Sequence, residues 1–545
     1  MQYLSPIDAA FLRMESKRTP MHVGALMTFR LPDEAPPDFV RALMLRMREK
    51  PFMPEPFNCK LARGKLAPAW VETKVDMDYH LRHSALPFPG GERELGQLVA
   101  RLHSHPLDFS RPLWECHLIE GLDPELDPGS GEPRGRSRRF ALYFKAHHCA
   151  IDGMGAMRMV QKWLSTDPGN RDTPGPWILA AKPPREERAR TPAGLLERLR
   201  QPAAAAAEQA QGIGELVRTL GKMLQGEDSS ARVALQTPRS RFNVPVSQQR
   251  RLGTQILELP RIKAIASATG TTANDVMLAV VGGTIRRYLQ ELGALPAKSL
   301  LASVPVALKR NDGKMGNAAA GFVVPMGTEL DDPRQRLERI HRITVRGKNE
   351  VNGMPYAAQM QFALLGIAPL MMGQMSGLLP KMPPFFNVVV SNVVLSRERL
   401  YLMGAELEAM YPVSFLFDGY ALNVTLVGYA DRVAVGFLGC RDAIPSLQRL
   451  AVYTRDALAE LEQALGLADS GYGVAAPAAA DAQPVVRAKA KPRSRDKTKV
   501  KPKPKVKPRT LSGEAVKPAR SAPAKPRARA ARKAVKSRLA ETQKG

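Results

Sequence analysis

Hydrophobic positions follow two kinds of spacing along the first part of the chain. Short runs of adjacent or alternating apolar residues predict strands at 21–31, 139–146, 300–308, 386–394, 421–429 and 433–438. Apolar residues three and four positions apart predict helices at 37–50, 154–165, 273–292 and 445–466. Because strands and helices intermix, the pattern favours an α/β fold over an all-α or all-β one.

Two segments interrupt this pattern. Residues 122–138 are rich in Gly, Pro and charge, and they predict a surface loop. Residues 186–250 are polar and alanine-rich with a weak helical period, and we interpret them as a largely helical connector. The chain then divides into an N-terminal half at 1–185, the connector at 186–250, a C-terminal half at 251–466 and a tail at 467–545.

The tail differs from the rest of the chain in charge. Residues 471–545 hold 22 Lys and Arg against 4 Asp and Glu, so +18 of the formal net charge of +28 lies there. No Phe, Trp or Tyr follows Tyr472. Such a segment buries too little apolar surface to offset its ordering entropy, so we expect disorder. A polybasic chain attracts anionic membrane or lipid-inclusion surfaces, and nucleic acid is a competing polyanion that we do not favour.

Other features of the composition bear on compartment. The four cysteines form no CxxC pair and have no zinc-like spacing to histidine, which argues against a zinc site or a disulfide framework. The first residues lack the basic and apolar regions of a secretion signal. The chain contains no run of about 18 apolar residues, so we expect no transmembrane helix. We therefore expect a cytoplasmic protein.

The most informative motif is His147-His148-Cys149-Ala150-Ile151-Asp152-Gly153, between a predicted strand and a predicted helix. An imidazole at a strand end can take a proton from a hydroxyl group, because its ordinary pKa is about 6.5. Asp152 would fix a ring orientation or brace the turn. Gly153 permits a tight turn or a close approach of backbone.

Taken alone, the histidine pair favours a structural role at the end of a strand. A zinc site would need further ligands at suitable spacing, and the sequence offers none. A Ser-His-Asp hydrolase would need a nucleophile elbow of the GxSxG type, which the chain lacks. Other parts of the sequence are therefore needed to distinguish a structural role of the histidine pair from a catalytic one.

Such blocks exist. HHxxxDG resembles the signature of the CoA-dependent acyltransferase superfamily, and the chain is similar to the bacterial wax ester synthase/acyl-CoA:diacylglycerol acyltransferase family. The similar blocks are residues 4–26, Pro112-Leu113-Trp114-Glu115, Asn274-Asp275, 303–306 and 404–442. The resemblance covers about residues 3–466 and excludes the tail.

The chain departs from this family at two places. The family often has Asn-Val-Pro-Gly-Pro where this chain has residues 392–396, Asn-Val-Val-Leu-Ser, which predicts a different turn after that strand. Cys149 stands where many relatives have Ala, a small change in volume.

The resemblance implies two chloramphenicol-acetyltransferase-like α/β subdomains with the active site between them. It implies transfer of a fatty acyl group from acyl-CoA to diacylglycerol, to a long-chain fatty alcohol, or to both. Acyl-CoA is then a co-substrate, and no metal or retained cofactor is expected. Such an enzyme would lie peripherally on the inner membrane face or on lipid inclusions. The alternative is a non-catalytic lipid- or nucleic-acid-binding protein that keeps this fold and uses the basic tail.

By the same resemblance, His148 is the general base, His147 shapes the turn beside it, and Asp152 with Gly153 supports the motif. His148 would take the proton of the acceptor alcohol and later protonate the departing CoA thiolate. Trp114, after Pro and Leu, is predicted to be a core anchor.

Two asparagines are candidates for substrate binding. Thr272-x-x-Asp275 has the spacing of a helix capping box, which places Asn274 in the first turn of a helix, where N–H groups favour negative charge. The resemblance favours a pocket role for Asn274 over plain capping. Asn392 is the second candidate and lies beside the departure at 392–396.

Residues 351–380 contain no charged side chain and are rich in methionine. Their three prolines and three glutamines argue against a membrane span. Two interpretations remain open: ordinary buried helices, or an adaptable wall for acyl chains or a surface that enters lipid.

Overall fold

The computed structural model describes residues 2–4, 6–49, 53–62, 68–122, 138–173, 175–177, 236–309, 315–352, 359 and 368–467. The loop predicted at 122–138 lies outside these residues except at its ends, and so does the tail beyond residue 467. The helical connector predicted at 186–250 is described only from residue 236, where 236–249 form turns and no helix. Residues 1–474 belong to one compact unit.

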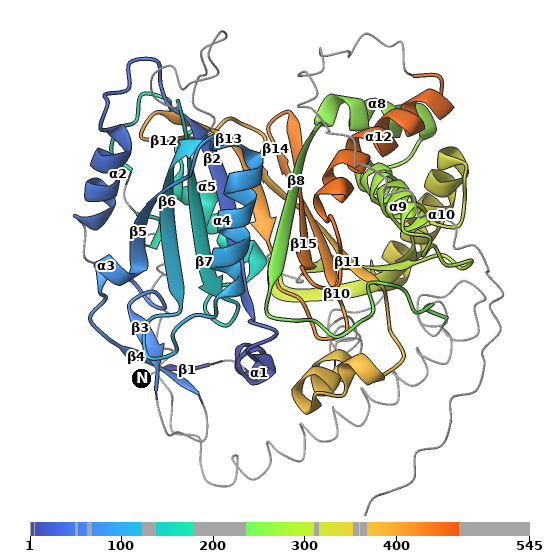
Figure 1. Cartoon of the computed structure of the whole chain (residues 1–545), viewed down its shortest axis with the longest axis horizontal. Coiled ribbons are helices and arrows are strands. Elements are labelled where there is room, and N and C mark those ends of the chain that lie inside the picture. The colour runs from blue at the N-terminus through green and yellow to red at the C-terminus, as the bar shows by residue number, and fades with distance from the viewer. Residues whose placement is uncertain are drawn as a thin grey trace, which may run out of the picture. The chain divides into compact units, whose positions relative to one another are not determined.

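Strands and helices alternate along the described chain (Figure 1). The strands are β1 (Gln2–Tyr3), β2 (His22–Arg30), β3 (Cys59–Leu61), β4 (Ala69–Glu72), β5 (Leu81–Ala85), β6 (Trp114–Leu122), β7 (Arg139–His147), β8 (Arg250–Glu258), β9 (Leu301–Lys309), β10 (Met315–Pro325), β11 (Val388–Ser396), β12 (Tyr401–Leu402), β13 (Ala405–Val413), β14 (Leu422–Tyr429) and β15 (Arg432–Cys440). The helices are α1 (Pro6–Met14), α2 (Phe39–Arg48), α3 (Met77–His80), α4 (Glu92–Ser104), α5 (Gly153–Trp163), α8 (Leu259–Thr269), α9 (Ala273–Glu291), α10 (Pro333–Asn352), the 3-10 turn η2 (Leu379–Lys381) and α12 (Gln448–Ala464). Residues 368–376 are also helical.

Two six-stranded sheets organise these elements. One has the order β12-β13-β2-β7-β6-β5, and the other has the order β10-β9-β11-β14-β15-β8. Neighbouring strands are antiparallel except for the pairs β5–β6, β9–β11 and β11–β14. A small sheet, β1-β4-β3, completes the described strands. The expected mixed α/β fold with two sheet-containing halves is confirmed, and every strand and helix predicted from apolar spacing within the described residues is present.

The two halves are not separate in sequence, because β12 and β13 leave the C-terminal half and join the N-terminal sheet. β13 pairs with β2, and the chain returns through residues 414–421 to β14 in the other sheet. β13 also passes close to β15: an added Cβ at Gly436 would lie 2.7 Å from the carbonyl oxygen of Pro412. The segment 414–421, which we call the crossing loop, therefore connects the two sheets.

Apolar packing also joins the halves. The largest core cluster combines Leu26 and Tyr143 of the first sheet with α9, α12 and the second sheet. Trp114 is a core anchor as predicted: it is 1% exposed, and its Nε1 donates to the carbonyl of Phe57 at 2.9 Å. In the parts of the chain that the structure describes, no helix is long and apolar enough to span a bilayer.

Candidate active site

The histidine pair lies where β7 ends. His147 is the last residue of β7 and stands opposite His22 of β2 in the antiparallel register. The backbone N–H of His148 donates to the carbonyl of Met21 at 2.9 Å, which ties the next residue to the segment before β2. Because successive side chains on an extended chain point to opposite faces, the two imidazoles enter different surroundings.

The His148 ring is held between two phenylalanines. Phe11 of α1 stacks on it with ring centroids 4.0 Å apart, and Phe415 of the crossing loop meets it edge-on at 5.5 Å. The side chain is partly exposed between them. Burial against these rings, with the neighbouring His147, lowers the pKa of His148 to about 4. The imidazole is therefore uncharged at neutral pH and can accept a proton.

No hydrogen bond to another residue fixes either ring nitrogen of His148 within the described residues. The ring is held by its aromatic neighbours Phe11 and Phe415.

His147 has a different environment and is 1% exposed. The backbone N–H of Cys149 donates to its Nδ1 at 3.1 Å, so its proton lies on Nε2. That Nε2 lies 3.4 Å from Oε2 of Glu15, a contact without hydrogen-bond geometry. The same carboxylate oxygen accepts from the backbone N–H of Met21. His147 therefore holds the turn at Cys149, and Glu15 holds Met21, whose carbonyl accepts from the N–H of His148.

Asp152 caps the helix that follows the motif. It is the N-cap residue of α5, and its Oδ1 accepts from the backbone N–H of Gly155 at 2.5 Å. Gly153 shows neither the tight turn nor the close approach that its residue type allows, because an added Cβ there would meet nothing within 4 Å. The close approach is at Gly155, where an added Cβ would lie 2.9 Å from Oδ1 of Asp152.

The crossing loop that carries Phe415 is pinned by a buried histidine that the sequence did not single out. His103 Nε2 lies 2.7 Å from the carbonyl of Ser414, and its Nδ1 lies 2.7 Å from the hydroxyl of Tyr143. A carbonyl can only accept, so Nε2 donates to Ser414 and Nδ1 accepts from Tyr143. Burial, followed by the nearby Lys145 charge, lowers the pKa of His103 to about 3. This neutral histidine uses both nitrogens to hold the loop.

Asp418 fixes the other end of the crossing loop. Its carboxylate forms an ion pair with Arg18 at 2.7 Å and accepts from the backbone N–H of Val246 at 3.0 Å. Its own N–H donates to Oε1 of Gln374 at 2.9 Å. Each of these partners comes from a different segment, so the loop is fixed from three directions.

An apolar cluster lies beside His148 and includes both of its phenylalanines. It joins α1 and Met21 to residues of the second sheet, to the helix at 368–376 and to the crossing loop. Its members are Phe11, Met14, Met21, Leu301, Val323, Leu370, Met371, Leu379, Met382, Phe385, Phe386, Val389, Phe415, Phe417 and Tyr420. Part of the methionine-rich stretch at 351–380 therefore lines a wall near the candidate base.

The structure brings the two predicted asparagines together. Asn392 Nδ2 donates to Oδ1 of Asn274 at 3.2 Å, and both side chains are partly exposed. Within the described residues no hydrogen bond or ring contact joins this amide pair to His148. Residues 392–396 belong to β11, which continues to Ser396, and the predicted difference from the family's turn stays a prediction.

The predicted capping box beside Asn274 is confirmed and extends further. Thr272 and Asp275 exchange the two reciprocal bonds, and Asp275 also accepts from His341 Nδ1 at 2.8 Å and from Thr344 Oγ1 at 2.6 Å. Burial raises the pKa of Asp275, but the bonds from His341, Thr344 and Thr272 outweigh it and lower the pKa. Asp275 therefore stays ionised and fixes the start of α9, and with it Asn274, against α10.

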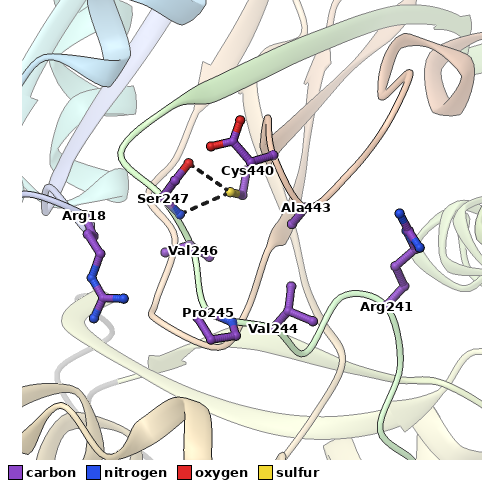
Figure 2. Close-up of a pocket in the computed structure, with 9 residues that line it drawn as sticks. Arg18, Arg241, Val244, Pro245, Val246, Ser247, Cys440 and Ala443 are labelled. Carbon is purple, nitrogen blue, oxygen red and sulfur yellow. Dashed lines mark hydrogen bonds between the residues drawn. The ribbon is translucent and has the colours of Figure 1, made fainter. Parts of the chain in front are cut away.

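A groove of about 540 Å³ opens beside the crossing loop. Figure 2 shows Arg18 and Arg241 on opposite sides of it, with residues 244–247 between them. The Sγ of Cys440 accepts from the N–H of Ser247 at 3.3 Å on its inner side. The Arg18–Asp418 ion pair connects this groove to the loop that carries Phe415.

Sequence reasoning missed four residues of this region: Phe11, Glu15, His103 and Phe415. Three of them lie inside blocks that carried the family resemblance, but no spacing rule assigned them a role. His103 lies on an amphipathic helix, where a lone histidine looks like an ordinary packing residue. Across the described ranges, no group of three or more His, Cys, Asp or Glu residues could hold a metal ion.

Comparisons with known proteins relate this chain to one family. Residues 4–277 match the family model of the wax ester synthase/diacylglycerol acyltransferase catalytic domain, and residues 315–462 match that of the WS/DGAT C-terminal domain. A putative diacylglycerol O-acyltransferase of Mycobacterium tuberculosis is 49% identical over 469 residues, which cover 85% of this chain and 99% of that protein. The O-acyltransferase WSD of Acinetobacter baylyi is 36% identical, over 84% of this chain and 96% of that protein.

Solved structures give the same result. A wax ester synthase/diacylglycerol acyltransferase from Marinobacter aquaeolei is similar with a TM-score of 0.67 and 37% identity, over 86% of this chain and 100% of that chain. The first condensation domain of the calcium-dependent antibiotic synthetase has a TM-score of 0.52 at 16% identity, over 86% of this chain and 97% of that chain, which shows a shared fold only.

Proposed function

Because the chain belongs to the wax ester synthase/diacylglycerol acyltransferase family and is an acyltransferase, we propose that it moves a fatty acyl group from acyl-CoA to diacylglycerol, to a long-chain fatty alcohol, or to both. His148 is the general base in this proposal. The observation that carries it is the partly exposed, uncharged His148 ring, held between Phe11 and Phe415 beside the apolar cluster. Long acyl chains need such a wall, and an alcohol needs such a base.

The reaction follows from one imidazole that serves both substrates. The unprotonated ring nitrogen of His148 takes the proton of the acceptor hydroxyl while the hydroxyl oxygen attacks the thioester carbonyl. The tetrahedral intermediate then collapses, the carbon–sulfur bond breaks, and the imidazolium returns the proton to the CoA thiolate. The products are the ester and free CoA, and no acyl-enzyme forms. The lowered pKa favours the second proton transfer, from the imidazolium to the thiolate, and makes the imidazole a weaker base in the first.

Other motif residues would position this base. His147 and Glu15 hold Met21, whose carbonyl accepts from the N–H of His148. Asp152 holds the first turn of α5 directly after the motif. We assign substrate binding to the amide pair Asn274 and Asn392, because both are partly exposed and β11, which carries Asn392, packs against α5.

The groove between Arg18 and Arg241 suits the phosphate groups of the acyl donor. Guanidinium groups bind phosphate oxygens through paired N–H donors, although Asp442 also lines the groove and partly offsets their charge. Asp418, which pairs with Arg18, is three residues from Phe415, a span of at most about 11 Å along an extended chain. Arg241→Gln should raise the KM for palmitoyl-CoA and leave the KM for a palmitoyl N-acetylcysteamine thioester, which has no phosphate, unchanged. An equal rise for both donors would place the phosphates elsewhere.

The test of the proposed function is an acceptor panel. Full-length protein is mixed with palmitoyl-CoA and either dipalmitoylglycerol, hexadecanol or no acceptor, and both thiol release and neutral lipid are measured. Acceptor-dependent release of CoA matched by ester is the expected result. The four cysteines are buried, so they add little background to the thiol assay. Failure with every acceptor would favour the non-catalytic alternative.

A further inference from the structure

The helix at 368–376 carries an unusual concentration of exposed apolar side chains. Nine large hydrophobic residues are exposed in the described residues, and three of them lie within seven positions: Met372 at 65%, Met375 at 48% and Leu378 at 52%. Met372 and Met375 are three positions apart and share one side of the helix, and Leu378 follows two positions after the helix ends. The segment is drawn in gold beside α1 in Figure 1. Apolar side chains gathered in this way mark interaction surfaces more often than isolated ones do.

The side chains on the opposite side of the same segment pack against the protein or form hydrogen bonds with it. Leu370, Met371 and Leu379 pack in the apolar cluster beside His148. Gln374 donates to the carbonyl of Met14 at 3.3 Å and to Oγ1 of Thr19 at 2.8 Å, and accepts from the crossing loop. The helix is therefore anchored by its inner side, and the outer methionines contribute little to its packing.

Positive charge lies on the segments that border this helix. Gln374 borders the segment 13–19, and Arg239 donates to the carbonyls of Lys381 and Met382 at 3.3 and 2.9 Å, which brings residues 236–241 alongside. Besides Arg241, which lines the groove, four exposed cations on these segments have no carboxylate partner among the residues described: Arg13, Lys17, Arg239 and Lys381. The single acidic residue of the three segments 13–19, 236–241 and 368–387 is Glu15, which turns inward to Met21 and His147.

We propose that Met372, Met375 and Leu378, with the four cations on the bordering segments, form a docking face for an anionic lipid surface. Methionine and leucine side chains would enter the acyl region, while the cations contact phosphate headgroups. An anionic lipid fits better than an acidic protein groove, because flexible methionines suit a fluid partner and the charge lies on the bordering segments. If the proposed function holds, an acceptor lipid would arrive one helix away from His148.

The first test places a reporter on the face itself. All four native cysteines are buried, so a cysteine introduced by Ser376→Cys can be labelled selectively with an environment-sensitive fluorophore. Vesicles that contain phosphatidylglycerol should shift its emission to the blue, and pure phosphatidylcholine vesicles should do so far less. The matched control is Val452→Cys, on the exposed side of α12, which should not respond. If the full-length protein sediments with the vesicles while the two labels behave alike, docking occurs elsewhere, for example through the basic tail, and the proposal is wrong.

The second test removes the apolar contacts without removing charge. Met372→Gln, Met375→Gln and Leu378→Gln combined should weaken partitioning into anionic vesicles by at least about tenfold, because each buried apolar side chain contributes on the order of tenfold. Leu45→Gln with Val452→Gln, two exposed apolar residues elsewhere, is the control and should leave partitioning unchanged. Equal partitioning of the triple variant and the control variant would overturn the proposal. A change in oligomeric state of the triple variant alone would also overturn it, because it would identify a second copy of the chain as the occupant.

These measurements need no acyl-CoA and no turnover. Docking by a His148→Ala protein should equal that of the unchanged chain, so loss of the proposed activity and loss of docking are separate results. A protein that transfers acyl groups but fails both vesicle tests would keep the proposed function and lose the docking face.

Discussion

His103 and His148 are two histidines with similarly lowered pKa values but opposite hydrogen bonding. Burial lowers the pKa of His103 to about 3 and that of His148 to about 4. His103 uses both ring nitrogens, one toward Ser414 and one toward Tyr143. Within the described residues no hydrogen bond to another residue holds the His148 ring, which lies against two aromatic rings. A perturbed pKa therefore does not identify the base; His148 differs from the buried His103 in that its side chain is partly exposed.

The crossing loop couples the two sites. His103 holds the carbonyl of Ser414, and the next residue, Phe415, forms one wall of the His148 ring site. His103 should thus influence catalysis through position and His148 through chemistry. Variants of the two histidines can test this distinction when turnover and stability are measured separately.

The largest effect is expected for His148→Ala. Loss of a general base should lower kcat by on the order of 10²–10⁴-fold with little change in thermal stability, since no residue that the structure describes forms a hydrogen bond with the ring. Thiol release from palmitoyl-CoA with hexadecanol measures the rate, and thermal denaturation measures the fold. Near-normal turnover would remove His148 from the chemistry and with it the contrast with His103.

His103→Leu should act on stability instead. It leaves the hydroxyl of Tyr143 and the carbonyl of Ser414 without partners in a buried region, which costs about 2–4 kcal/mol. Denaturant unfolding gives the change in the free energy of unfolding, and Tyr143→Phe, which loses one of the two bonds, is the smaller matched change. If the folded His103→Leu protein were as inactive as His148→Ala, then His103 would take part in the reaction itself.

The pH dependence of activity tests the protonation state of His148 directly. His148 acts as a base only when unprotonated, so activity should be lost as pH falls through its folded-state pKa of about 4. At pH 5.5 the rate should be about tenfold higher than a histidine with an ordinary pKa of about 6.5 would allow. The measurement is kcat/KM between pH 4 and 8, and an acid limb near pH 6.5 would show that the ring is not desolvated.

Stability must be followed across the same range. The folded pKa values of His103 and His148 lie below the unfolded value of about 6.5, so the unfolded state binds protons first as pH falls. Stability is therefore lost progressively below about pH 6.5. Thermal denaturation at each pH separates this loss from the acid limb of activity.

The same contrast shows how far the sequence could lead. Local patterns predicted the strand before the motif, the helix after it and the capping box at Thr272 and Asp275, because periodicity and capping depend on residues a few positions apart. The bond from His103 to Ser414 joins residues 311 positions apart, and that between Asn274 and Asn392 spans 118. No spacing rule encodes such pairs, and the return of β13 to the first sheet creates both the crossing loop and the wall at Phe415.

The smallest effects are expected at the start of α5, where four substitutions test how the motif is supported. Asp152→Ala removes the oxygen that accepts from the N–H of Gly155 and should cost about 1 kcal/mol, whereas Asp152→Asn keeps an acceptor and should cost less. Gly155→Ala should reproduce much of the Asp152→Ala loss, because its Cβ would lie 2.9 Å from Oδ1 and force the cap apart. Gly153→Ala is the matched control: its Cβ meets nothing within 4 Å, so unfolding should be unchanged. If Gly153→Ala nevertheless raises the KM for acyl-CoA, the space beside it belongs to the substrate; if it destabilises the fold as much as Gly155→Ala, the cap is not what supports the motif.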